Sequence, residues 1–257
     1  MNKLESTIPF DGFYNSYISS DIEHQIGQQI EWDTDIFDLN EDEQQILWDN
    51  YLSVNRSSFY NEIAEHFNVT RVSQWLWVTS FVNRIKKINH EKCPKIIDIG
   101  CGNGRNMNYS DIDFIGIDNC KRFVEICTEK GYNAICCNMT KIPLESNSYD
   151  AIICIASFHH LDNYNNRLQA LREMKRLLKP GGEILLSVWS INQPAKTKRV
   201  FNEYGDNIVL WTRYKRVFER YYYIFRLPEL VTLFNVVGLT IIEYSYDCGN
   251  EIYRLKV

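Results

Sequence analysis

The chain has 257 residues, of which 45% are hydrophobic, and a formal net charge of −5. A chain of this length can bury the core of one full domain together with an appendage. It contains no apolar window of about 18 residues and no basic N-terminal region followed by an apolar one, so we expect neither a membrane span nor a signal peptide. We therefore expect a soluble, cytoplasmic protein, with the nucleus as a second location, and no membrane partner.

The first fifty residues differ in composition from the rest of the chain. Residues 1–50 hold 12 acidic residues and one base, Lys3, which leaves a net charge of +6 for the remaining residues. Trp32, Phe37 and Trp48 lie among the acidic residues, so we expect a partly packed segment rather than a free tail. The sequence predicts an acidic N-terminal extension over 1–52 and a main domain over 53–257.

The order of the predicted elements after this extension gives the fold class. Apolar residues at helical spacing predict two helices, over 54–67 and 72–88. Strands and helices then alternate, which is typical of a parallel, doubly wound α/β sheet. The predicted strands are 96–99, 114–117, 134–137, 151–156 and 183–189, and the helices between them include 121–130 and 165–178. A helix from Pro228 to Gly238 and two antiparallel closing strands, 239–246 and 251–257, complete a seven-stranded Rossmann-like sheet with helices on both faces.

A glycine-rich loop follows the first predicted strand. Gly100, Gly102 and Gly104 occupy every second position, and Asp98 precedes them. Glycines allow positive φ and let a ligand lie against backbone N–H groups. A dinucleotide site uses G-x-G-x-x-G to hold a pyrophosphate, whereas an acid here would repel phosphate and suits an ammonium or sulfonium group. The pattern therefore favours S-adenosylmethionine over NAD or a mononucleotide.

The second and third predicted strands end in further candidate cofactor residues. Asp118 can accept hydrogen bonds from two ribose hydroxyls, beside Asn119; capping of the following helix is the structural alternative, and both roles are compatible. Asn138 and Met139 fit a loop that reads adenine, through a side-chain oxygen and the next backbone N–H. Many related sequences have Asp in place of Asn138, and an amide oxygen can accept the same bond, so we expect somewhat weaker binding.

The fourth predicted strand ends at Ala156, a further predicted cofactor contact, and leads to His159 and His160. Histidine pairs are more often structural than catalytic. However, the carboxyl end of a strand beside the ligand loop is the usual place for a site in this class of sheet. We therefore expect one of the two histidines to face the substrate.

The segment 196–226 is basic and aromatic, with eight basic and three acidic residues. Nucleic-acid surfaces have this composition because bases stack on aromatic rings while cations meet phosphates. A solvated loop followed by an ordinary strand would have the same composition, so composition alone leaves both interpretations open.

The eight cysteines include no C-x-x-C pair, and several fall in predicted strands. We interpret them as reduced, mostly buried residues and predict no metal site. A zinc site built from them is the alternative.

Several segments match a narrower pattern than the glycine loop does. They are 59–67 with Thr70 and Arg71, the Asp98 loop, the pair His159 and His160, 170–173, and Val188 with Trp189. Later, 206–211 resembles D-x-x-V-P-W with Leu210 in place of proline, 220–230 resembles R-Y-Y-H-x-[YF]-R-x-x-E-L, and 247–250 resembles D-x-G-N. Over about residues 53–257 the chain thus resembles the eukaryotic tRNA wobble-uridine carboxymethyl methyltransferases. The resemblance implies a class I S-adenosylmethionine-dependent methyltransferase domain, with Tyr60 among the cofactor residues.

The resemblance also implies a reaction, methyl esterification of 5-carboxymethyluridine at the wobble position of tRNA. A carboxylate with a reference pKa of about 4 is ionised at neutral pH, so it needs no general base. Arginine can hold such an anion, and the candidates are Arg71, Arg220 and Arg226. The resemblance favours Arg71 and Arg226 near the active site.

Other residues of the implied site have alternative roles. The resemblance implies that Asp206, Trp211 and Asn250 shape the uridine pocket. Core packing is the alternative for Trp211, and an exposed charge on a strand is the alternative for Arg220.

The resemblance implies tRNA as substrate and a heterodimer with a small zinc-binding activator protein, which would cover the apolar sheet edge at 132–137. The N-terminal extension is an alternative cover for that edge.

Two other functions stay open. A small-molecule methyltransferase, such as one acting on quinone precursors, would share the cofactor motifs but would not need the basic 196–226 segment. An inactive cofactor-binding scaffold is the other alternative, indicated only by Asn138 and Leu210.

Overall fold

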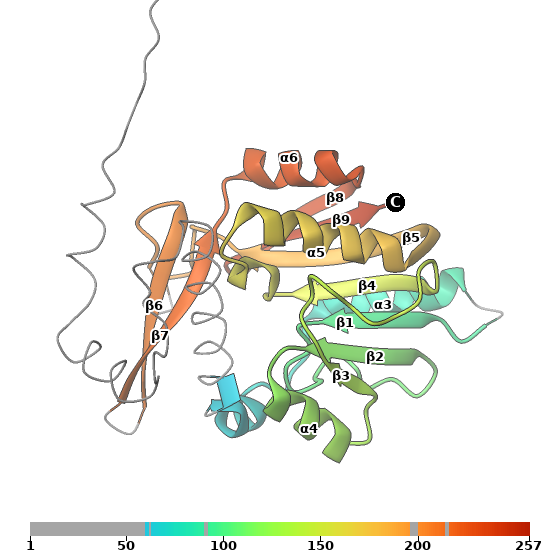
Figure 1. Ribbon diagram of the computed structural model, residues 1–257, viewed down its shortest axis with the longest axis horizontal. Helices are drawn as coiled ribbons and strands as arrows, with labels where there is room; N and C mark the ends of the chain where they lie inside the picture. Colours follow the sequence, from blue (N-terminus) through green and yellow to red (C-terminus); the bar gives the residue numbers. More distant parts are fainter. Residues whose placement is uncertain (1–59, 62, 90–91, 196–199, 214–215) are drawn as a thin grey trace, which may run out of the picture. The chain divides into compact units, whose positions relative to one another are not determined.

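The computed structural model describes residues 60–61, 63–89, 92–195, 200–213 and 216–257 (Figure 1). The acidic extension predicted over 1–52 and the first part of the helix predicted over 54–67 lie outside these residues. Residues 60–61 and 63–70 are helical. Within the described ranges, no helix is long and apolar enough to cross a lipid bilayer.

The centre of the fold is a seven-stranded sheet in the order β3-β2-β1-β4-β5-β9-β8. Its strands are β1 Lys95–Ile99, β2 Asp113–Asp118, β3 Ala134–Cys136, β4 Tyr149–Ile155, β5 Leu178–Trp189, β8 Thr240–Asp247 and β9 Asn250–Lys256. The first five are parallel, while β9 runs antiparallel to β5 and to β8. This arrangement confirms the predicted α/β class and the closing hairpin at one sheet edge.

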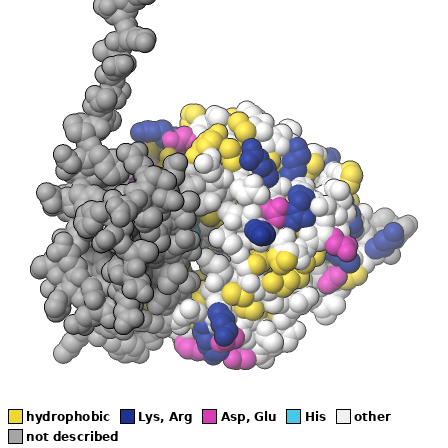
Figure 2. Space-filling view, in the orientation of Figure 1, with side chains coloured by type: hydrophobic (Ala, Val, Ile, Leu, Met, Phe, Trp, Pro, Cys, Tyr) yellow, Lys and Arg dark blue, Asp and Glu magenta, His cyan; other side chains and the backbone are white. Residues whose placement is uncertain are grey.

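Helices cover both faces of the sheet, as predicted. They are α3 Leu76–Ile88, α4 Lys121–Glu129, α5 Tyr164–Leu177 and α6 Leu227–Val237, with the short 3-10 helix η3 Phe158–His160 after β4. Residues of α3 and α4 pack into one core cluster, whereas those of α5 and α6 pack into another on the opposite face. On the side shown in Figure 2, basic, acidic and hydrophobic side chains are interspersed over the described part of the surface.

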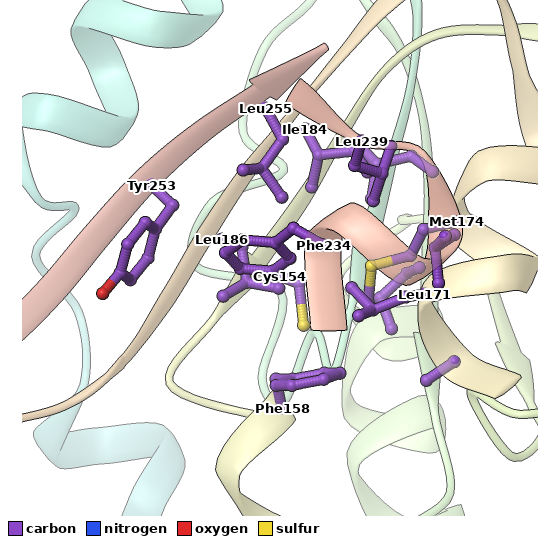
Figure 3. Close-up of a cluster of buried hydrophobic side chains, with 14 of the residues drawn as sticks. Cys154, Phe158, Leu171, Met174, Ile184, Leu186, Phe234, Leu239, Tyr253 and Leu255 are labelled. Atoms are coloured by element: carbon purple, nitrogen blue, oxygen red, sulfur yellow. The ribbon is translucent and has the colours of Figure 1, made fainter. Parts of the chain in front are cut away.

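Alternation along the buried strands explains how one sheet serves both cores. In β1, Ile96 packs with the α3 side and Ile97 with the α5 and α6 side, and both are fully buried. Parallel sheets covered on both faces require such near-continuous apolar strands. Figure 3 shows the α5 and α6 side, where Leu171 and Met174 meet Phe234 and strand residues such as Leu186.

Most element boundaries lie within one to three residues of the sequence prediction, and two differ by four residues or more. Helix α3 begins at Leu76 rather than at 72. The residues before it, 71–75, are not helical, and among them Gln74 donates its side-chain N–H to the Arg105 carbonyl at 2.9 Å. Strand β5 begins at Leu178, which pairs with Tyr149 before the register shifts. Helix α5 does end where the Lys-Pro-Gly-Gly segment begins, and the strand absorbs that segment as an irregularity.

A separate two-stranded sheet is the main element that was not predicted. β6 Gly205–Arg213 and β7 Arg216–Ile224 pair antiparallel as a hairpin. The connection at 214–215 is Tyr-Lys, which lacks the Gly, Asn or Asp that signals a two-residue hairpin turn. β7 lies against η3, beyond the end of β4 (Figure 1). The basic 196–226 segment is therefore largely a hairpin beside the carboxyl edge of the sheet.

Candidate active site

The glycine loop after β1 approaches the segment after β4 closely. Gly100 has φ +74°, and a Cβ built on it would lie 1.9 Å from Ser157 Oγ. Its N–H donates to the Ile117 carbonyl at 2.7 Å. Only glycine fits this position, because any side chain would both strain the backbone and displace Ser157. Gly102 and Gly104 also have positive φ, but both are buried, and their N–H groups donate within the protein, to Asp118 Oδ2 at 2.9 Å and to the Cys101 carbonyl at 3.0 Å.

Asp98 has a buried carboxylate of which only one oxygen accepts a hydrogen bond. The residue is 1% exposed, and Oδ2 accepts from Asn106 Nδ2 at 3.4 Å. Oδ1 is buried and has no hydrogen-bond partner. Burial raises the pKa of Asp98 to about 7, although Asn106 and Arg105 act to lower it and Asp118 raises it. An unpaired buried oxygen is costly to the free protein, so this position suits a bound group that brings N–H donors or positive charge.

Asp118 holds the glycine loop and the start of α4 together. Its Oδ2 accepts from the Gly102 N–H and its Oδ1 from the Cys120 N–H, both at 2.9 Å. Burial raises the pKa of Asp118 to about 6, against the lowering effect of these backbone hydrogen bonds. Each carboxylate oxygen can accept a second bond, so the loop role and a ribose contact are compatible. Asn119, the next residue, is exposed.

Asn138 uses its side-chain oxygen within its own loop. That oxygen accepts from the Thr140 N–H and from Thr140 Oγ1, both at 3.0 Å. Met139 is partly buried against the main core. The proposed adenine contact through the Asn138 oxygen stays a prediction, because a ligand would have to compete with Thr140 for the same lone pairs.

Ala156, the residue after β4, has a conformation that non-glycine residues rarely adopt, with φ +50°. Its N–H lies 3.1 Å from both the carbonyl and the hydroxyl oxygen of Ser187. Such strain is found mainly where the surrounding structure enforces it, often at functional sites. Here it turns the chain from β4 into Ser157 and η3.

The two histidines of η3 have different environments. His159 is fully buried, and its Nδ1 accepts from the Trp189 N–H at 3.0 Å. His160 Nδ1 lies 2.9 Å from the Tyr221 carbonyl, and its Nε2 lies 3.2 Å from the Tyr60 hydroxyl. A carbonyl only accepts, so His160 carries its proton on Nδ1, and in the neutral ring Nε2 accepts from Tyr60. Both histidines thus hold elements together, and a direct contact of either with substrate stays a prediction.

Five aromatic rings meet at this edge of the sheet, and we call them the aromatic cluster: Tyr60, His159, His160, Trp189 and Tyr222. Tyr222 stacks on Trp189 with centroids 4.1 Å apart and an angle of 11°. It also lies 5.1 Å from the His159 ring and 4.6 Å from the His160 ring. The cluster joins the helical segment 60–70, η3, β5 and β7 beside the glycine loop.

The three candidate arginines occupy different positions. Arg71 is exposed, and its Nη1 donates to Thr70 Oγ1 at 3.1 Å. Arg226 is exposed, with its guanidinium carbon 4.7 Å from the centre of the Tyr204 ring. Arg220 places that carbon 5.4 Å from the centre of the Tyr222 ring. Of the three, Arg220 therefore lies against the aromatic cluster.

The remaining predicted pocket residues lie around the hairpin and the closing turn. Asp206 on β6 accepts from the Tyr221 hydroxyl. Asn250 is 5% exposed, donates to the Asp247 carbonyl at 3.1 Å and pairs with Trp189 across β5 and β9. Trp211 belongs to β6, and its side chain lies outside the described part of the chain. Two pocket assignments, Asp206 and Asn250, thus fall on residues that also stabilise local structure.

Sequence reasoning did not select Tyr222, Trp189, Ser157 or Asn106 as site residues. Trp189 appeared only within a family motif. Tyr222 and Ile224 occupy alternate positions of β7, and both are buried. Such alternation can indicate the buried face of a strand, but the sequence Tyr-Tyr-Tyr-Ile does not show which of the two faces that is.

The cysteines show no sign of a shared site. All eight are free, and Cys101, Cys120, Cys127 and Cys154 are buried. Cys93, Cys136 and Cys248 are exposed, so burial is less general than predicted. The described residues contain no group of three or more His, Cys, Asp or Glu side chains placed to hold a metal ion.

Comparison with known sequences gives one family model and several relatives. A model described as "Methyltransferase domain" matches residues 97–186. The tRNA (carboxymethyluridine(34)-5-O)-methyltransferase of Schizosaccharomyces pombe is 32% identical over 214 residues, which cover 74% of this chain and 91% of that protein. The tRNA (carboxymethyluridine(34)-5-O)-methyltransferase ALKBH8 of Mus musculus is 38% identical over 141 residues, or 54% of this chain. This chain covers 20% of the mouse protein's length, so it corresponds to only part of that protein.

Solved structures resemble the fold at low sequence identity. An S-adenosylmethionine-dependent methyltransferase from Clostridium acetobutylicum gives a TM-score of 0.57 at 12% identity, covering 77% of this chain and 98% of that one. The amino pentose methyltransferase CalS10 from Micromonospora echinaspora gives 0.57 at 17% identity, covering 76% and 96%. At these identities the likeness supports the architecture of the sheet and its helices.

Proposed function

This chain belongs to the family of the tRNA (carboxymethyluridine(34)-5-O)-methyltransferases, and from that premise we propose that it uses S-adenosylmethionine to esterify the carboxylate of 5-carboxymethyluridine at the wobble position of tRNA. The observation that carries the proposal is the match to the fission yeast enzyme over most of both chains. The site geometry supports it, because the cofactor loop and the aromatic cluster lie beside the same edge of the sheet.

The residues at the glycine loop fit the cofactor. Asp98 Oδ1 is buried and unpaired, which suits the ammonium group of an amino acid moiety. Gly100 lets the loop pack directly against Ser157, where a Cβ would collide. When bound, S-adenosylmethionine supplies a methyl group on a sulfonium. In this proposal Asp98 holds the ammonium group and Asp118 the ribose.

The other predicted cofactor contacts surround these groups. They are Tyr60, Gly102, Gly104, Asn119, Asn138, Met139 and Ala156. Asn138 and Met139 would line the adenine position, and the exposed Asn119 would flank the ribose. Tyr60 would close the site from the helical segment 60–70, where its hydroxyl bonds His160.

The chain's own residues need not remove a proton in this reaction. The substrate carboxylate is already ionised at neutral pH, so the protein has to strip water from it and orient it. The aromatic cluster, whose rings are buried or half-buried, supplies a largely apolar surface for that purpose. The bonding of His160 to Tyr60 and to the β7 backbone gives it a positioning role, since it fixes the hairpin against the helical segment 60–70.

The uridine and its RNA would meet the residues around the hairpin. We propose that Asp206, Trp211 and Asn250 shape the nucleoside pocket. The exposed positions of Arg71 and Arg226 on either side suit contacts with an RNA backbone near the active site. The net positive charge of the chain beyond residue 50 favours a polyanionic substrate.

Strand β3 forms one edge of the sheet, and we propose it as the docking edge for a small zinc-binding activator protein. Ile135 is half-buried and Cys136 is exposed on this short strand. An open edge offers backbone groups that a partner strand can pair with.

A tRNA-modifying role further favours the cytoplasm, with the nucleus as a second location.

Methyl transfer to defined tRNA tests the proposed function. Full-length protein, with and without such an activator, is given labelled S-adenosylmethionine and one tRNA prepared with either 5-carboxymethyluridine or uridine at the wobble position. We expect label only in the carboxymethylated tRNA. Equal label in both tRNAs, or cofactor binding without transfer to either under both conditions, would contradict the proposal and favour a small-molecule substrate or an inactive relative.

A further inference from the structure

We infer that Arg220 is the residue that binds the carboxylate of the substrate nucleoside and thereby selects the carboxymethylated uridine. This inference rests on the proposed function and assigns the anion-binding role to a residue of the hairpin. It differs from the family resemblance, which favours Arg71 and Arg226 near the active site.

The register of β7 directs Arg220 toward the aromatic cluster. Residues two apart on a strand point to the same face, so Arg220, Tyr222 and Ile224 share one side of the hairpin. Tyr222 is 2% exposed and Ile224 fully buried on that side. The guanidinium carbon of Arg220 lies 5.4 Å from the centre of the Tyr222 ring, so the charge sits beside the ring that stacks on Trp189.

Arg220 has a buried donor without an acceptor. Its Nε is buried and makes no hydrogen bond, and none of the ion pairs among the described residues involves its guanidinium. The half-buried Arg84 also has an unpaired Nε, but its guanidinium forms an ion pair with Glu183. The half-buried Arg176 and the buried Arg167 have engaged donors. Arg176 bonds Glu173 and the Ile142 carbonyl, and Arg167 bonds the carbonyls of Leu161 and Asp162. A buried guanidinium donor that no protein group satisfies is costly unless a ligand completes it.

The same guanidinium faces the cofactor side of the site. Burial and the neighbouring Tyr222 raise the pKa of Tyr60, while the Arg220 charge lowers it and the Asp118 charge raises it. Tyr60 is therefore within electrostatic reach of both Arg220 on the hairpin and Asp118 on the cofactor loop. Contacts connect the two sides as well, because the His160 ring lies 4.6 Å from the Tyr222 ring and its Nε2 lies 3.2 Å from the Tyr60 hydroxyl. An anion held by Arg220 would therefore lie near Tyr60, one of the predicted cofactor residues.

The chemistry of guanidinium fits a carboxylate that must also react. Nε and one Nη can donate two parallel hydrogen bonds to the two carboxylate oxygens. Each oxygen keeps a further lone pair, so the contact orients the anion without using up its nucleophilic electrons. Uridine without the carboxymethyl group has no carboxylate, so it would leave the buried Nε of Arg220 without an acceptor. The residue would therefore act in substrate selection as well as in orientation.

Arg71 and Arg226 are less suited to this role. Both are exposed, and Arg71 already donates to Thr70 Oγ1 at 3.1 Å. Anion contacts in water are weaker and less selective than those at a buried donor.

The test compares binding of two RNA hairpins that differ only in charge at one group. Anticodon stem-loops carry either 5-carboxymethyluridine or its neutral amide, 5-carbamoylmethyluridine, at the wobble position, and their affinities for the full-length protein are measured. The variants are Arg220→Ala and Arg220→Gln, with Arg172→Ala on the exposed side of α5 as the matched control. Melting temperature and S-adenosylmethionine affinity establish that each variant is folded. Arg220→Gln retains a long polar side chain and serves if Arg220→Ala does not fold.

We expect the unaltered protein and Arg172→Ala to prefer the carboxylate RNA over the amide, and both Arg220 variants to lose about 10- to 100-fold of affinity for the carboxylate RNA only. Cofactor affinity should be unchanged. A folded Arg220 variant that keeps the preference overturns the inference while methyl transfer by the unaltered protein upholds the proposed function. An unaltered protein that neither prefers the carboxylate RNA nor methylates the corresponding tRNA overturns both.

Discussion

The buried, partly unpaired carboxylate of Asp98 destabilises the ligand-free protein, and we propose that the ammonium group of a bound cofactor compensates for this. Its side chain is 1% exposed, its Oδ1 has no partner, and burial raises its pKa to about 7. Because the folded-state pKa lies above the usual value of 3.8, the folded protein keeps a proton between these pH values that the unfolded chain has lost. The associated stability is present at low pH and is lost as the pH rises toward 7.

This linkage predicts opposite effects of Asp98→Asn on stability and binding. At pH 8 the substitution removes a buried, unpaired charge, so the free energy of unfolding of the cofactor-free protein should rise by about 1–3 kcal/mol. S-adenosylmethionine binding should be lost, because an amide cannot match a carboxylate as partner for an ammonium group. Chemical denaturation and calorimetric titration measure the two effects. A variant that is less stable at pH 8, or that binds cofactor normally, would contradict this role for Asp98.

Cofactor affinity should also depend on pH. A bound cation favours the ionised form of Asp98, so binding below pH 7 has to release the proton that the free protein holds. The dissociation constant should therefore increase as the pH falls from about 7.5 to 5.5, and more steeply below 6, where Asp118 with a pKa of about 6 also gains a proton. Calorimetry in buffers of different ionisation enthalpy should detect proton release near pH 6.5. A constant affinity over this range would show that neither carboxylate has to be ionised for binding.

At the residue level, the sequence alone predicted the positive φ of the glycine loop, while its contacts with the cofactor stay a prediction. The acid and the alternating glycines are adjacent in the chain, and their chemistry follows from local backbone requirements. The pairing of Asp98 with Asn106 and the exposure of Arg71 depend on tertiary contacts that no short pattern encodes. The predicted ligand contacts of Tyr60, Asn138 and the histidines accordingly remain to be measured.

At the level of elements, Tyr222 supplies the most buried contact between the β6 and β7 hairpin and the main sheet, beside the hydrogen bonds of Tyr221 with His160 and Arg167. Tyr222 is 2% exposed and stacks on Trp189, with His159 and His160 on its other contacts. Removal of a buried aromatic ring generally costs about 3–5 kcal/mol. Tyr222 packs with only two other buried hydrophobic residues, Phe201 and Ile224, in the small core beside the hairpin. The loss of stability should therefore appear mainly as local opening of the hairpin.

Tyr222→Ala should therefore increase amide hydrogen exchange across 205–224 while exchange in β1 and β4 stays slow. RNA affinity should fall because the hairpin no longer presents its residues in place, and S-adenosylmethionine affinity should be retained. Tyr246→Ala is the matched control, since that tyrosine is 47% exposed on edge strand β8. Unchanged exchange across the hairpin in Tyr222→Ala would show that other contacts hold it.

The elements also show where sequence periodicity suffices. The parallel strands were predictable because β-branched runs such as Lys95–Ile99 are buried on both faces and are separated by amphipathic helices. The β6 and β7 hairpin was missed because its turn lacks the usual residues and its strands mix charged, aromatic and aliphatic side chains. Helix α3 begins four residues later than predicted, where Gln74 forms a tertiary hydrogen bond to the Arg105 carbonyl directly after the glycine loop.

At the level of the whole molecule, charge and family membership point to the same substrate. Overall the chain is acidic, but its acidic excess is concentrated in the first fifty residues, and the rest carries a net charge of +6. A protein that neutralises RNA phosphates releases counterions, so its RNA affinity falls with salt. The basic hairpin segment lies beside the carboxyl edge of the sheet, so substrate attraction and chemistry are proposed to meet there.

The central claim is that this chain converts the carboxylate of a wobble 5-carboxymethyluridine into its methyl ester. The most direct measurement is nucleoside mass spectrometry of tRNA that carries 5-carboxymethyluridine, after incubation with full-length protein and S-adenosylmethionine, with and without the activator protein, and before and after mild alkali. We predict that the carboxymethyluridine peak is replaced by its methyl ester and that alkali restores the free acid. A methylated nucleoside that survives alkali, or an unchanged carboxymethyluridine peak although the cofactor is bound, would contradict the account.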